Sequence, residues 1–111
     1  MDDFVEQGLL YDFYGCLLTP HQRDIYEMLI YQDLSLNEIA EQQGISKQAV
    51  SDLIRRVNGQ LTEYERRLGL LQRFRRIRNQ CDALDKAANC LSDETAAAQI
   101  RCCTETIRNE L

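Results

Sequence analysis

The sequence predicts an all-α fold of about five helices, with a helix-turn-helix followed by C-terminal dimerisation helices. Two observations lead to this prediction. The chain of 111 residues contains one proline and five glycines, while residue types that favour helices are common. Apolar residues also recur at steps of three and four, as on the buried face of a helix. This length suits a single domain at residues 1–111, made of a helix-turn-helix unit (1–68) and a helical tail (70–111).

Two helices are expected before the helix-turn-helix. The first spans residues 2–17, and its buried side would hold Phe4, Leu9, Leu10, Phe13, Tyr14 and Leu17. Thr19, Pro20 and Gln22 then mark a new start, with a capping threonine, a proline at the first helical position and a glutamine three residues after the cap. The second helix runs to about residue 31. Its core side would hold Ile25, Met28, Leu29 and either Tyr26 or Tyr31, with His21 on its exposed first turn.

Residues 35–58 carry the pattern of a helix-turn-helix. Ser35 can cap a first helix, whose inward face would hold Leu36, Ile39 and Ala40. Gly44 suits the left-handed backbone just past a helix end, and Ser46 can cap a second helix. The apolar stripe of that second helix would consist of Ala49, Val50, Leu53, Ile54 and Val57. Such a tight turn predicts the steep crossing typical of DNA-reading helix pairs.

The outward side of the second helix is a candidate for contact with DNA. Its residues are mostly short or polar and can bond to base edges in a major groove, and two arginines follow where phosphates would lie. The predicted DNA-binding residues are Ser46, Lys47, Gln48, Ser51, Asp52, Arg55 and Arg56. The same apolar spacing would also suit an ordinary helical hairpin within a small all-helical domain.

Four segments between residues 11 and 70 carry a family resemblance: YDFYGCLLTPHQ, DLSLNEIAEQQGIS, KQAVSDLIRR and YERRLGL. They resemble the YlxM family of small bacterial proteins and, more distantly, region four of sigma factors, which reads promoter DNA. The resemblance implies a DNA-binding regulator that takes part in the signal recognition particle pathway. The alternative is an adaptor of that pathway that contacts protein or RNA. Ser51 departs from the tyrosine usual in the family, and the tail after Arg78 matches no familiar pattern.

The chain beyond residue 69 predicts self-association. Gly69 could end the preceding long helix or lie within it. The apolar residues of the expected helix 70–91 alternate at four and three steps over three heptads, and a helix with that stripe must bury it. Part would pack on the N-terminal helices, and the rest predicts a homodimer interface of Leu70, Phe74, Ile77, Cys81, Leu84, Ala88 and Leu91. Ser92 can cap a final helix, whose apolar side would hold Ile100, Cys103, Ile107 and Leu111.

Charge argues against strong DNA binding. The formal net charge is -5, whereas a strongly DNA-binding domain usually displays a basic footprint. Only residues 61–79 are clearly basic, with six arginines against two glutamates. For Arg73, Arg75, Arg76 and Arg78 a solvated helix face is the preferred interpretation over an RNA site, because Phe74 alone could stack on bases. We therefore expect DNA binding to be weak and sensitive to salt.

No enzymatic, metal or membrane signature accompanies these helices. The sequence has no glycine-rich phosphate loop and no nucleophile with a plausible base, so the protein is expected not to be an enzyme. Five cysteines without a CxxC pair and a single histidine predict free thiols, with neither metal nor cofactor. No apolar run could span a membrane, and the acidic N-terminus lacks a signal-peptide layout. Both predict a cytoplasmic protein without membrane insertion.

Overall fold

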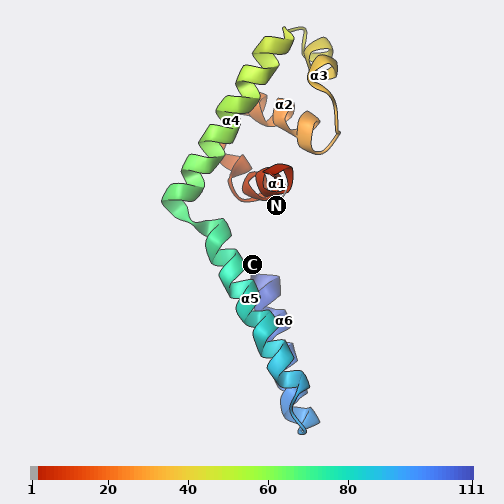
Figure 1. Cartoon of the computed structure of the whole chain (residues 1–111), viewed down its shortest axis with the longest axis vertical. Helices are drawn as coiled ribbons and strands as arrows, with labels where there is room; N and C mark the ends of the chain where they lie inside the picture. The colour runs from red at the N-terminus through yellow and green to blue at the C-terminus, as the bar shows by residue number, and fades with distance from the viewer. Residues whose placement is uncertain (1–2) are drawn as a thin grey trace. The chain divides into compact units, whose positions relative to one another are not determined.

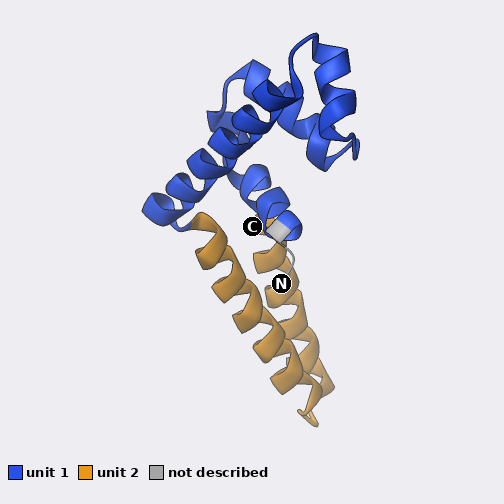
Figure 2. Ribbon diagram, turned by 45° about the horizontal axis from the view of Figure 1, so that its top comes forward, with its two compact units in different colours: residues 1–69 blue, residues 70–111 orange. Residues whose placement is uncertain are grey.

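The computed structural model of the protein describes residues 3–111 and confirms the all-α fold. Its helices are α1 (Asp3–Tyr14), the 3-10 helix η1 (Gly15–Leu17), α2 (Pro20–Ile30), α3 (Leu36–Gln43), α4 (Lys47–Leu68), α5 (Leu70–Asn89) and α6 (Glu94–Glu110) (Figure 1). These are six α-helices where about five were expected. They form two compact units, one ending at Gly69 and the other spanning Leu70–Leu111 (Figure 2).

The first helix is shorter than the expected 2–17. Asp2 lies outside the described residues, and the α-helix ends at Tyr14, where the tighter turn of η1 follows. Phe4 and Leu17, both expected in the core, are 42% and 52% exposed. The buried side chains of this segment are Leu10, Tyr11, Tyr14 and Leu18. The tighter turn changes the helical phase after residue 14, which explains why Leu18 rather than Leu17 is buried.

Buried tyrosines connect α1 and α2 to the long helix α4. The Tyr14 hydroxyl donates a hydrogen bond of 2.6 Å to Glu65, and the Tyr26 hydroxyl donates one of 2.5 Å to Asn58. Tyr26 is therefore the core tyrosine of α2, whereas Tyr31 is 58% exposed. Desolvation by burial raises the pKa of Tyr26 to about 12. These bonds satisfy the polar ends of large buried rings and fix α4 against the two N-terminal helices.

The start of α2 follows the predicted signal. The Thr19 hydroxyl accepts a hydrogen bond from the backbone N–H of Gln22, whose side chain in turn accepts from the N–H of Thr19. Pro20 occupies the first helical position, and His21 is exposed, as expected. This reciprocal cap orients α2 so that Ile25 is fully buried in the core shared with α3 and α4.

The second unit is an antiparallel hairpin of α5 and α6 (Figure 2). The cap of α6 is Asp93 rather than the predicted Ser92, because the Asp93 carboxylate accepts the N–H groups of Thr95 and Ala96. Cys81 and Ala88 are buried within this hairpin, at 1% and 0% exposure. Both were predicted to lie in a homodimer interface. The correction follows from the partner helix α6, which already covers that part of the α5 stripe.

Candidate nucleic-acid interface

The helix-turn-helix consists of α3, the turn at Gly44 and the first half of α4. The Ser35 hydroxyl accepts the N–H of Glu38 at 3.1 Å, and the Glu38 carboxylate accepts the N–H of Ser35 at 2.9 Å. The latter bond is the main reason why the pKa of Glu38 is lowered. Gly44 ends α3 with φ 67° and ψ 32°, the left-handed conformation that a glycine adopts without steric cost.

The α4 helix starts two residues after this turn. The Ser46 hydroxyl accepts the N–H of Ala49 at 3.0 Å and so caps the helix, as predicted. Val50 is fully buried against Ile25 and Ile39, which belong to α2 and α3. Around these three lie the partly buried side chains of Met28, Leu29, Leu34, Leu36, Ala40, Ile45, Leu53 and Ile54. Core packing on one side thus fixes which side of α4 faces outward.

The predicted DNA-binding residues all have accessible surface. Lys47, Gln48, Arg55 and Arg56 are exposed, as is the cap Ser46, while Ser51 and Asp52 are half-buried. Gln48, Asp52 and Arg55 share one face, because residues three and four apart are neighbours on a helix surface. Residues 46–56 contain three basic side chains and one acidic side chain, a net charge of +2. This segment is therefore basic within a unit that is acidic overall.

Asp52 links two of these side chains. Gln48 donates a hydrogen bond of 3.0 Å from Nε2 to the Oδ1 atom of Asp52. An Arg55 guanidinium nitrogen lies 3.5 Å from the same oxygen. The pairing holds Gln48 with its amide nitrogen toward Asp52, and the carboxylate offsets part of the Arg55 charge. The helical spacing of these residues is a signal from which the contact could have been predicted.

Two arginines near the end of α4 are already engaged with a carboxylate. Arg66 and Arg67 donate hydrogen bonds of 2.6 and 2.8 Å to the Oε1 atom of Glu63. These bonds, that of Arg66 above all, lower the pKa of Glu63 to about 2. A part of the basic segment 61–79 is thus neutralised locally.

Comparison with known proteins supports the assignment of the fold. Residues 1–100 match the family described as "Putative helix-turn-helix protein, YlxM / p13 like". The chain belongs to this family.

Relatives of this YlxM / p13-like protein are similar along most of their length. A UPF0122 protein of Thermoanaerobacter sp. (strain X514) is 40% identical over 110 residues, which cover 99% of this chain and 94% of the relative. One of Geobacillus kaustophilus (strain HTA426) is 44% identical over 84 residues, or 76% of each chain. One of Symbiobacterium thermophilum is 44% identical over 91 residues, covering 78% of this chain and 85% of the relative.

The structure of this YlxM / p13-like protein adds one residue to the candidate interface. Ala49 was assigned to the apolar stripe of the second helix, but it is exposed. The buried stripe is carried by Val50, Val57 and Leu61, with Leu53 and Ile54 partly covered. An exposed alanine methyl near the start of α4 can contact the methyl group of a thymine. The small side chain of Ala49 suits either a close crossing of two helices or an open surface, so the sequence alone could not show which of the two it occupies.

The described residues contain neither a cluster of metal-ligand side chains nor a helix that could span a membrane. Within residues 3–111, no three side chains of His, Cys, Asp or Glu lie close enough to hold a metal ion together. No helix in this part of the chain is long and apolar enough to cross a membrane.

Proposed function

We propose that this protein is a DNA-binding regulator that reads base edges with the first three turns of α4. The observation that carries the proposal is the exposed polar surface of a helix that is held by an αL turn at Gly44 and by the core around Val50. On this surface Gln48 and Asp52 are bonded to one another between the exposed Lys47 and Arg56. Membership of a helix-turn-helix family supports the same function.

Each side chain would have a distinct role. Gln48 uses its amide nitrogen toward Asp52, which leaves the amide oxygen to accept a bond from an adenine or cytosine amine. Ser51 would also approach base edges, while Lys47 and Arg55 would reach bases or phosphates. Arg56 would contact phosphate only, because it lies away from the Gln48–Asp52 line of the helix.

Affinity would be modest and would depend on salt. The segment 46–56 carries a net charge of +2, so few phosphates can be neutralised by one copy of the helix. Since each phosphate that is neutralised adds about 0.9 to the slope of log affinity against log salt, binding would be weak and would fall further as salt rises. Specific sites would therefore be found at about 50 to 100 mM salt, where release still favours a weakly basic surface.

A selection from random duplexes at low salt tests the proposal. Enrichment of a motif is expected, and Gln48→Ala should relax preference at one base pair at a cost of about 1 to 3 kcal/mol. Arg56→Ala should weaken all sequences alike and reduce the salt slope by about one unit. Failure to enrich any motif with the folded wild-type protein would overturn the DNA proposal.

The second candidate function is an adaptor of the signal recognition particle pathway that binds protein or RNA. The net charge of -5 and the partial neutralisation of Arg55 by Asp52 disfavour binding to any nucleic acid, so they support a protein partner for this adaptor. The pathway itself comes from the resemblance to YlxM proteins. Capture from lysate, with and without nuclease, separates the two functions. Recovery of particle components that survives in the Lys47→Ala, Arg55→Ala double variant supports the adaptor, whereas recovery only without nuclease indicates a nucleic-acid bridge.

A further inference from the structure

The α5–α6 hairpin has small residues inside and large apolar residues outside. The fully buried side chains of the hairpin are Leu71, Cys81 and Ala88 of α5 and Ala97 and Thr104 of α6, and four of these five are small. The larger apolar residues Leu84, Leu91, Ile107 and Leu111 are 39 to 47% exposed. Apart from Leu71, none of the large apolar side chains of the hairpin is fully buried, although such side chains usually lie in the interior. Small residues let the two helices approach closely. The exposed large residues are then available for contact with another molecule.

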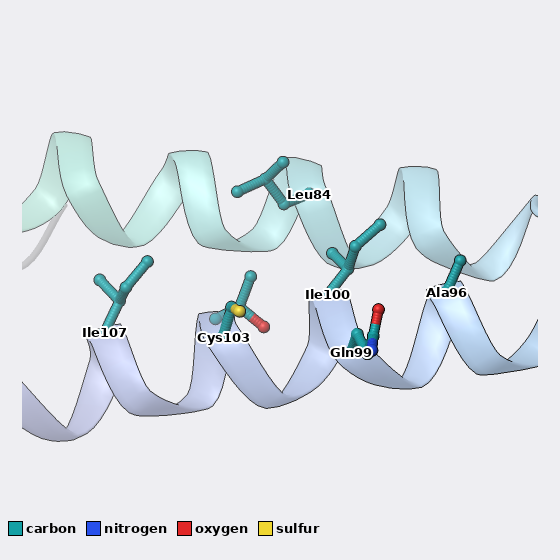
Figure 3. A pocket seen from close by; sticks show the side chains of 7 residues that line it. Leu84, Ala96, Gln99, Ile100, Cys103 and Ile107 are labelled. Carbon is teal, nitrogen blue, oxygen red and sulfur yellow. The ribbon is translucent and has the colours of Figure 1, made fainter.

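Two of these large side chains, Leu84 and Ile107, border a groove on one side of the hairpin. The groove measures about 440 Å³, and its main lining residues are Leu84 of α5 and Ala96, Ile100, Cys103 and Ile107 of α6. Figure 3 shows these side chains along the seam between the two helices. We call this surface the α5–α6 groove. Its apolar lining at an open surface is typical of a protein interaction site.

Polar contacts also connect the two helices along this seam. Arg101 donates a hydrogen bond of 2.9 Å to Asn89, and the Thr104 hydroxyl donates one of 2.5 Å to Asp85. Arg108 bonds to Asp85 and to Asp82, both at 2.7 Å. These hydrogen bonds and ion pairs already provide partners for the charged groups of Arg101, Arg108, Asp82 and Asp85. Arg108 also borders a smaller hollow of about 220 Å³ with Phe74, Arg78 and Leu111, so that part of the seam is both polar and apolar, whereas the lining of the α5–α6 groove is mainly apolar.

We propose that the α5–α6 groove binds the same groove of a second copy of this chain, with the two hairpins antiparallel. Each copy contributes both the hollow and the large side chains that fill it, so one surface is complementary to itself, as a two-fold interface requires. Four helices would then enclose the exposed leucines and isoleucines as a bundle core. The inference rests on the second unit alone and does not depend on DNA binding.

Charge along the hairpin favours a second copy in the antiparallel orientation. Residues 70–79, at the open end, contain four arginines and no acidic side chain. Residues 80–111, which include the connecting loop and all of α6, contain six acidic and three basic side chains. Antiparallel copies place the basic end of each hairpin beside the more acidic remainder of the other. A parallel pair would bring the two basic ends together, which like-charge repulsion disfavours.

This surface differs from the interface predicted from the heptads. Leu84 belongs to both sets, Leu91 does not line the groove, and Cys81 and Ala88 are buried inside the hairpin. The groove adds Ile100, Cys103 and Ile107 of α6. The heptad pattern of α5 alone could not include them, because half of the surface comes from another helix.

Light scattering and sedimentation of the full-length chain test the proposal. Wild type should have twice the monomer mass of 12.9 kDa at micromolar concentration. Leu84→Glu and Ile107→Glu should each shift it to the monomer mass while circular dichroism stays helical. Leu17→Glu is the matched control, because Leu17 is 52% exposed but lies in the other unit, and it should remain dimeric. A monomeric wild type, or dimers that persist in both groove variants, would overturn the proposal.

The native cysteines give a second test that needs no destabilising substitution. Cys103 lines the groove near the middle of the hairpin, whereas Cys102 is also exposed but projects about 100° away around the helix. Mild oxidation should cross-link two chains through Cys103. Cys102→Ser should keep this cross-link, and Cys103→Ser should lose it. A cross-link that is lost in Cys102→Ser and kept in Cys103→Ser would contradict an interface on the side of α6 that carries Cys103.

Orientation is tested by moving the thiol toward the loop. In antiparallel copies, Leu91 of one chain lies far from Leu91 of the other, since each is at the loop end of its own hairpin. Leu91→Cys in a Cys103→Ser, Cys90→Ser background should therefore not increase dimer cross-linking. Efficient cross-linking at residue 91 would indicate parallel hairpins and overturn the antiparallel arrangement.

Discussion

Gln48 and Arg55 share one carboxylate oxygen of Asp52 on the outward face of α4. The amide nitrogen of Gln48 is 3.0 Å from it, and a guanidinium nitrogen of Arg55 is 3.5 Å from it. The carboxylate thus orients Gln48, which would read a base in the proposed function, and it offsets part of the Arg55 charge that would face phosphate. Its removal is expected to affect these two properties in opposite directions.

Asp52→Asn should tighten binding to DNA of any sequence while weakening discrimination between sequences. Removing one negative charge close to the phosphates is worth about 1 kcal/mol, or roughly fivefold in affinity. Fluorescence anisotropy with several duplexes over a salt series measures both effects. Asp24→Asn makes the same chemical change at an exposed position of α2 and should have a smaller effect. Equal gains in the two variants would mean that total charge, and not the face of α4, determines binding.

Gly44→Ala should destabilise the protein by about 1 kcal/mol, because alanine at a φ of 67° is strained. No atom lies within 4 Å of the position that a Cβ would occupy there, so backbone strain is the main cost. Gly59→Ala is the matched control. A Cβ at this exposed position inside α4 also meets nothing, and there alanine should stabilise the helix by about 1 kcal/mol. Denaturant unfolding should show a lower free energy of unfolding for Gly44→Ala and a higher one for Gly59→Ala. A change in the same direction in both variants would contradict the explanation by backbone strain.

Most features that depend on neighbouring residues were predictable from the sequence, although the cap of α6 is Asp93 and not the predicted Ser92. A helix cap links residues no more than three apart, so the sequence alone can be sufficient to predict it. This holds for the caps at Thr19 and Gln22, at Ser35 and at Ser46. Gly44 and Gly69 both end helices in the left-handed conformation for the same local reason. The Gln48–Asp52 contact has the spacing of one helical turn, and it could have been read in the same way.

Features that depend on distant partners were not predictable. The heptads of α5 indicate that the apolar stripe of this helix is covered, but they do not identify α6 as the helix that covers Cys81 and Ala88. Tyr14 finds its acceptor at Glu65, 51 residues along the chain. Leu17 is apolar at helical spacing and is nevertheless largely exposed, because the turn of η1 changes the phase of the segment. Phe4, which lies before that turn, is exposed at the start of α1. Spacing identifies candidate faces, and only the packing decides among them.

Acid should weaken the contacts of Glu63 at the end of α4. Its pKa is lowered from 4.5 to about 2 by Arg66 and Arg67, so its stabilising contribution is present above pH 4.5 and is lost as pH falls toward 2. NMR titration of the Glu63 carboxyl should show a midpoint near the lowered value. Arg66→Gln should raise this pKa, since Arg66 is its largest cause, and Arg55→Gln should not. A wild-type midpoint near 4.5 would show that the ion pair is not populated in solution.

The five cysteines should react in two classes if all are free thiols. Cys16, Cys90, Cys102 and Cys103 are exposed, while Cys81 is buried between the hairpin helices. A colourimetric thiol reagent should therefore modify four groups quickly in native protein and the fifth only after denaturation, because a thiol must be accessible to react. The reaction of Cys103 should become slower as protein concentration rises, since the proposed second copy would cover the α5–α6 groove. A chelator should leave both the thiol count and the melting temperature unchanged. Stoichiometric zinc retained after dialysis, or rapid reaction of Cys81 in the native protein, would contradict this assignment.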